Sequence, residues 1–376
     1  MVDILIGGDV CPIRRSERYF VNGEVEAIFS DLLVELEKAD LTVVNLECPL
    51  IKTESPILKS GPVLGADTAC VNGLKNAHIQ VVNLANNHIM DHGVNGLEST
   101  ISACRGHGLY TVGAGENVVR AGEIFLREVK GVRVGILAFT EKQFSIATRT
   151  SPGANPLSLI EYVRKVRCYR NDFDFFLVLL HGGKENYSYP SPRLQEICRF
   201  MIEEGANAVI CQHLHCPGCY EGYEGGHIVY GQGNFIFDAY PYPDKTWYNG
   251  YLVRISIDNY MKSKMNIIPY VQSDSRIGAR RMPEEEERDF IRCLQQQSVL
   301  IEDIDFVERK WKAFCDDNRY LYFSYLRGHS RLFRVLNRYI HFSDIFYSRH
   351  ALAALLNAVR CETHREAVET ILSNIR

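Results

Sequence analysis

The sequence predicts an α/β fold with a helical region at its C-terminal end. Short runs of Val, Ile and Leu alternate with helical stretches through the first 215 residues. These runs are apolar at consecutive positions, which is typical of strands in a sheet that helices cover on both faces. The roughly 100 residues after position 275 instead carry apolar side chains at spacings of three and four, which indicates helices.

The expected elements follow one another along the chain. The strand "VDILIGG" precedes a helix that begins near Ser30, and the strands "LTVVNLE" and "IQVVNLANNH" precede a helix through "VNGLESTISACRGHG". The strands "VRVGILAFT", "FFLVLLHGG" and "NAVICQHLH" complete the series. A helix at 191–205 lies between the last two, with Ser191 as its N-cap, Pro192 in its first turn and Gly205 at its end.

The pattern changes twice in the second half of the chain. Residues 226–271 contain the strands "HIVYGQGNFIF", "GYLVRISI" and "MNIIPYV" without helices between them, which predicts an antiparallel part of the sheet. The segment "RRMPEEEERDFIRCLQQQ" then opens the helical region. We therefore expect a main domain over residues 1–275 and a helical region over residues 276–376, which packs on the main domain or on a second subunit.

Composition and charge exclude several classes of protein. The hydrophobic content of 46% and the charged content of 23% are ordinary for a globular protein, and the net charge of −4 lacks the basic excess of nucleic-acid and membrane-surface binders. The longest apolar run, "FFLVLL", is too short to cross a bilayer, and Met1 leads into a strand where a secretory signal would stand. We expect a cytoplasmic protein with neither a membrane span nor a nucleic-acid partner.

Five of the expected strands end in side chains that bind metal ions or carry protons. These side chains are Asp9, Asn45 with Glu47, Asn86 with Asn87 and His88, His181, and His213 with His215. The carboxyl ends of strands in an α/β sheet meet at one edge, so we expect these groups to share a metal site. Oxygen and imidazole ligands suit Mn²⁺, Fe or Zn²⁺ in a hydrolytic role, and a carboxylate such as Glu47 can bridge two ions.

The segment "CQHLHCPGCYEG" at 211–222 allows three interpretations. His213, His215, Cys216 and Cys219 are compatible with a structural zinc site, and the two cysteines are compatible with a redox pair. We favour the third, in which the histidines bind a catalytic metal, because two histidines one residue apart lie on the same side of an extended segment. The twelve cysteines are scattered along the chain, so we expect mostly reduced core residues.

Several motifs occur together in a characteristic order. They are "GGDV", "NLECPL", "NLANNHIMDHG", "GAGEN", "GVRVGILAFT", "HGGKENYSYPSPRLQEICRFMIEEGANAVICQHLH" and "HIVYGQGNFIFD". With them, residues 3–270 resemble the CapA family of capsule and poly-γ-glutamate biosynthesis proteins, which share the calcineurin-like metallophosphatase fold. The resemblance implies a two-sheet sandwich flanked by helices, with two divalent metal ions at the strand ends. It does not extend to the C-terminal helices.

The resemblance also implies a role for each residue of the site. The implied ligands are Asp9 and His215 for one ion, Asn87, His181 and His213 for the other, and Glu47 as the bridge between both. His88 is implied to be the acid that protonates the leaving group, and Asp91 orients it. Lys59 is expected to contact an anionic substrate, and Glu185 and Asn234 are expected to line the pocket.

Two positions depart from the pattern of related phosphoesterases. Many of them carry Asp-x-His in the first motif, whereas this chain has Cys11 at the third position. We interpret Cys11 as a packed thiol. Many relatives also carry a bulky residue after the histidine of "HGG", whereas this chain has Gly182.

Two functions follow from these patterns. The first is a metal-dependent hydrolase that cleaves a phosphoester or a related polar bond in an anionic cell-envelope polymer or its precursor. The alternative is a non-hydrolytic accessory protein that binds the polymer or a synthase, with residues 280–376 as the region that contacts a biosynthetic partner protein.

Overall fold

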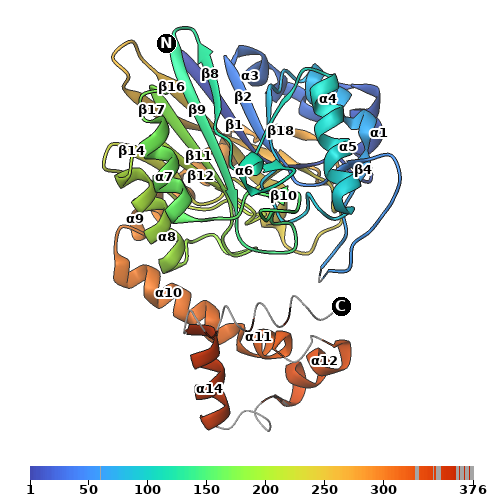
Figure 1. Cartoon of the computed structure of the whole chain (residues 1–376), viewed down its shortest axis with the longest axis vertical. Helices are drawn as coiled ribbons and strands as arrows, with labels where there is room; N and C mark the ends of the chain where they lie inside the picture. Colours follow the sequence, from blue (N-terminus) through green and yellow to red (C-terminus); the bar gives the residue numbers. More distant parts are fainter. Residues whose placement is uncertain are drawn as a thin grey trace. The chain divides into compact units, whose positions relative to one another are not determined.

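The structure is a computed structural model that describes residues 1–59, 61–326, 330–341, 343, 349–360, 364, 368 and 372. The chain divides into two compact units, Met1–Val307 and Glu308–Arg376. The first unit holds two large β-sheets with helices beside them, and the described part of the second is helical (Figure 1). Parts of the predicted C-terminal helical region, among them 344–348 and 373–376, lie outside the described residues.

The first large sheet has the N-terminal strand in its middle. Its strands are β1 (Val2–Cys11), β2 (Leu41–Leu46), β5 (Val81–Asn83), β6 (Tyr110–Val112), β15 (Asn234–Phe237), β16 (Asn249–Ile257), β17 (Ser263–Gln272) and β18 (Ala279–Arg281). Their order is β18-β17-β16-β1-β2-β5-β6, and β15 pairs with β1. Strands β1, β2, β5 and β6 are parallel, so their carboxyl ends lie at one edge.

The second large sheet follows later in the chain. Its strands are β8 (Phe125–Val129), β9 (Val132–Thr140), β11 (Phe175–His181), β12 (Ala208–Gln212), β13 (Tyr220–Tyr223) and β14 (Gly226–Val229). Their order is β13-β14-β12-β11-β9-β8, with β9, β11, β12 and β14 parallel to one another. Two small sheets pair β3 (Leu50–Ile51) with β4 (Ala66–Asp67), and β7 (Ala114–Gly115) with β10 (Gly153–Ala154).

Helices cover both sheets of the first unit. Those of the first half are α1 (Glu17–Asn22), α2 (Val25–Phe29), η1 (Ser30–Leu32), α3 (Leu33–Lys38), η2 (Thr68–Cys70), α4 (Val71–Asn76), α5 (Gly93–Gly106), α6 (Val118–Ala121) and α7 (Leu159–Tyr169). Those of the second half are α8 (Pro192–Glu203), η3 (Lys245–Tyr248), α9 (Glu284–Leu300), α10 (Ile304–Asp317), α11 (Arg319–Tyr325), α12 (Arg331–Ile340) and α14 (Arg349–Arg360). Of these, α11, α12 and α14 belong to the second unit. The predicted cap of α8 is confirmed, since Ser191 Oγ accepts a hydrogen bond from Leu194 N.

Three hydrophobic clusters separate the layers of the first unit. One lies between the first sheet and α1–α5, one between the two sheets, and one between the second sheet and α7 and α8. On β11, Leu177 and Leu179 belong to the cluster between the sheets, whereas Val178 and Leu180 belong to the cluster beside the helices. Successive side chains of a strand point to opposite faces, so a strand between two apolar layers must be apolar throughout. The expected two-sheet sandwich flanked by helices is confirmed.

The predicted antiparallel region of residues 226–271 is only partly correct. Strands β16 and β17 are antiparallel as expected, but β14 pairs in parallel with β12, and β15 pairs in parallel with β1. The chain crosses from the second sheet to the first between Val229 and Asn234, so β14 and β15 belong to different sheets and do not form a hairpin.

The first compact unit extends beyond residue 275, where the sequence pattern changes. Helix α9 contributes Leu294 to the cluster between the sheets, and Ile301 and Val307 lie in the cluster beside α7 and α8. These apolar side chains anchor the segment after β18 to the sandwich, and the division into compact units therefore falls after Val307. Within the described residues, no helix is both long enough and apolar enough to cross a membrane.

Candidate metal centre

Polar side chains from both sheets meet where the parallel strands end. Asp9 lies near the end of β1, Glu47 directly follows β2, His181 is the last residue of β11, and His213 directly follows β12. These strands belong to two sheets, so the site lies between the carboxyl ends of the two layers. The position was expected from the strand endings, whereas the division of the ligands between two sheets came only from the implied fold.

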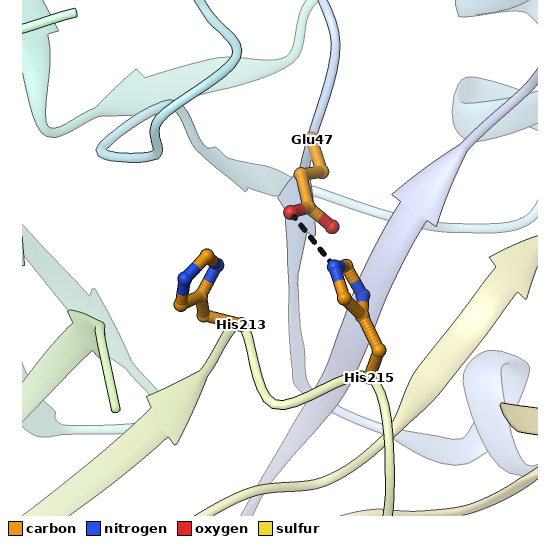
Figure 2. Close-up of side chains that lie close together, drawn as sticks. All are labelled: Glu47, His213 and His215. Atoms are coloured by element: carbon orange, nitrogen blue, oxygen red, sulfur yellow. Dashed lines mark ion pairs between the residues drawn. The ribbon is translucent and has the colours of Figure 1, made fainter. Parts of the chain in front are cut away.

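Glu47, His213 and His215 form the tightest group (Figure 2). One ligand atom from each lies within 4.8 Å of the others, and all three residues are buried. Figure 2 shows the two imidazole rings on the segment after β12, on the same side of the Glu47 carboxylate. The dashed contact joins Glu47 Oε1 to His215 Nε2 at 3.8 Å. Among the described residues, this is the group of imidazole and carboxylate ligands best placed to hold one ion.

Three other predicted ligands adjoin this group. His181 Nε2 lies 3.4 Å from Glu47 Oε1 and 2.9 Å from Asn87 Oδ1. Asp9 Oδ2 lies 3.7 Å from His215 Nδ1 and accepts a hydrogen bond from the backbone N–H of His213. The structure therefore brings together all six residues that the sequence predicted as metal ligands.

A layer of polar residues orients these ligands. Asn45 Nδ2 donates to Asp9 Oδ1 at 2.7 Å, and Asn234 Oδ1 lies 2.9 Å from His215 Nδ1. Asn234 is fully buried against His215, which leaves His215 Nε2 facing Glu47. Glu185 lies 3.7 Å from His213 Nε2, and its side chain is 45% exposed. Partners on the far nitrogen of a ligating histidine fix the orientation of its ring and its tautomer.

The backbone at the two histidines differs from the extended segment that the sequence suggested. His213 has φ +104° and His215 has φ +57°, values that residues with a Cβ rarely adopt. Alternation along a strand therefore does not explain why both rings face the site. Two residues held in this region cost about 1–3 kcal/mol each and persist where the surrounding structure fixes them, often at functional sites.

Burial controls the protonation of the group. Burial, together with the charge of Glu47, raises the pKa of Asp9 to about 6, and burial raises the pKa of Glu47. Burial lowers the pKa of His181 to about 3 and also lowers the pKa of His213, so both rings are neutral near pH 7. Burial opposes the charge on His215, but the carboxylates of Glu47 and Asp9 outweigh it and raise the pKa of His215.

The unsatisfied atoms of the site fit a cation. Both carboxylate oxygens of Glu47 and Nδ1 of His213 are buried and have no hydrogen-bond partner within the described chain. A buried carboxylate without partners is strongly unfavourable, and buried charges in proteins are normally paired or bound to metals. A neutral imidazole with an unpartnered nitrogen, as in His213, beside a carboxylate is part of the donor set of Zn²⁺, Mn²⁺ and Fe sites. The residues present therefore fit a divalent metal.

Beside the metal ligands lies a second cluster, formed by His88, Asp91 and Lys59. His88 Nδ1 and Asp91 Oδ2 are 2.6 Å apart, which is hydrogen-bond distance. Lys59 Nζ lies 2.6 Å from Asp91 Oδ1, and its side chain is only 3% exposed. Lys59, predicted to contact substrate, thus contacts the partner of the predicted acid.

The cysteines stand apart from the metal group. All cysteines in the described part of the chain are free. Cys216 and Cys219 are buried, and burial raises the pKa of their thiols to about 11 and about 12. Burial and a hydrogen bond with Cys48 raise the pKa of Cys11 well above its usual value, which fits a packed thiol. Glu47 completes the cluster with His213 and His215, so the interpretation as a structural zinc site with thiolate ligands gains no support.

The side chain of Glu141 explains why a glycine, Gly182, follows His181. A Cβ at Gly182 would lie 2.8 Å from Cγ of Glu141 and 3.0 Å from its Oε1. Glu141 Oε1 in turn accepts a hydrogen bond from the backbone N–H of Gly183. The Glu141 side chain therefore occupies the space next to position 182 that a bulky residue would need.

Three residues of the site had no role assigned from the sequence, although two of them, Asn45 and Asn86, were expected there. Asn45 and Asn86 were recognised as strand endings, and the structure joins them through an Asn86 Nδ2–Asn45 Oδ1 hydrogen bond of 3.2 Å. The indole of Trp247 lies 4.9 Å from the His215 ring, centroid to centroid. Nothing in the motif "DKTWYNG" signals that contact, because it depends on how η3 packs against the loop after β12.

The family comparison agrees with the motifs. Residues 3–239, more than half of the chain, match the model of the family described as bacterial capsule synthesis protein PGA_cap. The chain belongs to this family. All six predicted ligands, the His88–Asp91 pair and Lys59 lie within the PGA_cap match.

Two curated relatives of this chain are CapA proteins. The capsule biosynthesis protein CapA of Bacillus anthracis is 31% identical over 240 residues, which cover 61% of this chain and 58% of that protein. The PGA biosynthesis protein CapA of Bacillus subtilis is 29% identical over 236 residues, which cover 61% of this chain and 62% of that protein. The PGA_cap chain thus matches about three fifths of the length of these relatives.

Solved structures are more distant. A phosphatase from Mycoplasma pneumoniae has a TM-score of 0.48 at 16% identity, and the match covers 73% of this chain and 95% of that one. A calcineurin-like phosphoesterase from Bacillus subtilis has a TM-score of 0.41 at 12% identity, with 81% and 98% covered.

Proposed function

We propose that this PGA_cap protein is a metal-dependent hydrolase that cleaves a phosphoester or a related polar bond in a capsule or poly-γ-glutamate polymer, or in its precursor. The observation that carries the proposal is Glu47, a fully buried carboxylate without a hydrogen-bond partner in the described chain, which faces His181 and His215. Such an arrangement is unfavourable without a cation and is ordinary with one. We propose a capsule or poly-γ-glutamate polymer because the CapA relatives are named for capsule and PGA biosynthesis.

The proposed site holds two divalent ions, of Mn, Fe or Zn. Their ligands in this proposal are Asp9, Glu47, Asn87, His181, His213 and His215. Bound ions of this kind supply Lewis acidity and a hydroxide nucleophile at neutral pH. Asn45 holds the Asp9 carboxylate, and Asn234 holds the His215 ring with Nε2 toward Glu47.

His88 carries the proton in this proposal. Its Nδ1–H donates to Asp91 Oδ2, so Nε2 is the nitrogen that faces away from that carboxylate. As the ester bond breaks, the Nε2–H bond breaks and the proton passes to the leaving-group oxygen, while the electron pair stays on Nε2. Protonation of a leaving group by a positioned side chain accelerates such reactions about 10²–10⁴-fold.

Removal of metal tests the proposal directly. We expect purified protein to contain Mn, Fe or Zn by elemental analysis. We expect chelation to abolish hydrolysis of bis(4-nitrophenyl) phosphate, and readdition of metal to restore it.

The fluorescence of Trp247 reports metal binding independently of activity, because a paramagnetic ion such as Mn²⁺ quenches an indole packed on a ligand ring. Of the two tryptophans, Trp247→Phe should remove the Mn²⁺ response, and Trp311→Phe should retain it.

Two results would refute the proposed hydrolase function. One is protein that binds no divalent metal in elemental analysis and in the Trp247 titration. The other is metal-bound protein without metal-dependent turnover on phosphomonoesters, phosphodiesters and amide-linked polymer precursors.

The accessory function remains the second candidate, because one exposed apolar surface favours it. On α12, Leu332 is 69% exposed and Tyr339 is 73% exposed. Relatives from Mycobacterium tuberculosis, 28% identical over 210 residues, are named probable polyglutamine synthesis accessory proteins. In this version a synthase or other biosynthetic partner contacts the helical region, and the site binds the anionic polymer without cleaving it. In both versions the protein acts in the cytoplasm.

A truncation separates the two functions. Residues 318–376 follow the end of α10, so their deletion keeps Leu294, Ile301 and Val307 in the core of the first unit. If the protein is a hydrolase, the truncated protein should keep its metal and at least half of its turnover. If it is an accessory protein, calorimetry with purified poly-γ-glutamate or the synthase should show binding that the truncation removes, with no turnover in either form.

A further inference from the structure

Lys59 occupies an unusual position for a loop lysine. It lies in the segment between β3 and β4, next to Leu58, which is fully exposed. The Lys59 side chain is nevertheless only 3% exposed, and its amine points inward to Asp91 Oδ1 at 2.6 Å. Its Nζ is also 3.4 Å from the carbonyl oxygen of Asn87. A lysine that served to attract a substrate would keep its amine at the surface, where it can reach an anion.

Asp91 joins this loop to the predicted acid. Its Oδ1 accepts from Lys59 Nζ, and its Oδ2 accepts from His88 Nδ1 at 2.6 Å and from Leu64 N at 2.8 Å. Its backbone carbonyl accepts from Ile57 N at 2.9 Å. The carboxylate is fully buried, and each oxygen is held by donors that lie in fixed directions. A buried carboxylate held on both oxygens cannot rotate without losing charge-assisted hydrogen bonds.

The geometry of the two donors on Asp91 explains what Lys59 contributes. Lys59 Nζ and His88 Nδ1 lie 3.3 Å apart, and each contacts a different oxygen of the Asp91 carboxylate. If the ammonium were absent, Oδ1 would be a buried anionic oxygen without its donor, and the carboxylate would turn or the loop would shift. Either change moves Oδ2, which fixes the direction of the His88 ring.

We infer that Lys59 is a positioning residue for proton transfer, which holds Asp91 so that His88 directs its Nδ1–H toward Asp91 and presents its Nε2–H, the proton that is donated, to the leaving group. This inference rests on the proposed hydrolase and deepens it. The proton donor is then a unit of three residues. Lys59 comes from one segment, residues 57–64 without Ser60, and His88 and Asp91 come from the other, residues 88–91. Lys59 acts through Asp91 and does not touch the substrate.

Leaving-group dependence tests this role. A 4-nitrophenyl ester departs without a proton, whereas an unsubstituted phenyl ester needs one, so the two substrates report on the acid separately. We expect Lys59→Met to lower kcat about 10²-fold on phenyl esters and less than about 5-fold on 4-nitrophenyl esters, with KM and metal content unchanged. Lys59→Arg retains a cation and should restore part of the phenyl-ester rate. Lys52→Met removes an exposed lysine of the same loop and should match wild type.

Three results would overturn the inference. Equal losses on both esters together with lower metal content would mean that Lys59 only supports the fold. A raised KM with unchanged kcat would mean that Lys59 contacts the substrate. Full activity of Lys59→Met on phenyl esters would mean that Asp91 holds His88 without it.

A measurement on the histidine ring keeps this inference separate from the proposed hydrolase. ¹⁵N NMR of the zinc-loaded protein reports whether Nδ1 of the His88 ring carries a proton, separately from the Nε2–H that is donated to the leaving group. We expect Nδ1 to be fully protonated in wild type and Lys52→Met, and only partly protonated in Lys59→Met. An unchanged His88 signal in Lys59→Met overturns the positioning role, even if the protein hydrolyses esters. A changed signal supports it, even if no ester proves to be a substrate.

Discussion

Replacing Glu47 by Gln should remove bound metal and lower turnover by at least about 10³-fold, which corresponds to about 4 kcal/mol of transition-state stabilisation. Glu47 presents its carboxylate to His181 Nε2 and His215 Nε2 at 3.4 and 3.8 Å. The amide has the same shape but no charge, so it cannot balance a divalent ion. Elemental analysis and the hydrolysis of bis(4-nitrophenyl) phosphate measure the two effects.

Glu47→Gln should not lower the melting temperature of the metal-free protein, although it lowers turnover. In the metal-free protein, the Glu47 carboxylate is buried with no hydrogen-bond partner among the described residues, and burial raises its pKa. Since this charge opposes folding, metal-free Glu47→Gln should unfold at the same temperature as metal-free wild type or higher. The rise in melting temperature that metal gives to wild type should be absent in the variant.

The exposed Glu37→Gln on α3 is the control for the loss of one negative charge, and it should behave as wild type in all three measurements. Full metal content and full turnover in Glu47→Gln would show that the carboxylate is not a ligand. A large drop in the melting temperature of the chelated variant would mean that Glu47 supports the fold, and the activity loss would then carry no information on metal binding.

The second large effect is expected at His88. His88→Ala should lower kcat on phenyl esters about 10²–10⁴-fold and leave the metal content unchanged, because the group that is best placed to bind metal does not contain His88. The ring is nearly buried and bonds to Asp91 through Nδ1, so its loss removes the proton donor and leaves the metal ligands in place. Steady-state rates on phenyl and 4-nitrophenyl esters measure the effect, and the 4-nitrophenyl rate should fall much less.

His107→Ala provides the matched control. His107 is half-buried at the end of α5, and it contacts the carbonyl of Ala103 within its own helix. Its removal should leave both rates within about twofold of wild type, as for surface changes away from a site. Loss of metal together with activity in His88→Ala would identify His88 as a ligand and would exclude its role as the acid.

The sequence predicts the fold well where a local pattern has one physical cause. The run "FFLVLL" is apolar at every position because β11 lies between two apolar layers, and Ser191 and Pro192 begin α8 through cap chemistry within a few residues. The strands after residue 226 were assigned less well. Pairing direction depends on whether the chain makes a hairpin or crosses to another sheet, and a short connection at 230–233 permits both.

The sequence by itself determined which residue types end the strands, and hence that Asp9, Glu47, His181, His213 and His215 were candidates for one metal site. A strand end has a fixed place at the edge of a parallel sheet, so local pattern alone gives this answer. Only the tertiary structure decided where the amine of Lys59 points. Loop residues have no periodic constraint, and their side-chain directions depend on contacts with segments far away in the chain, here the Asp91 carboxylate 32 residues later.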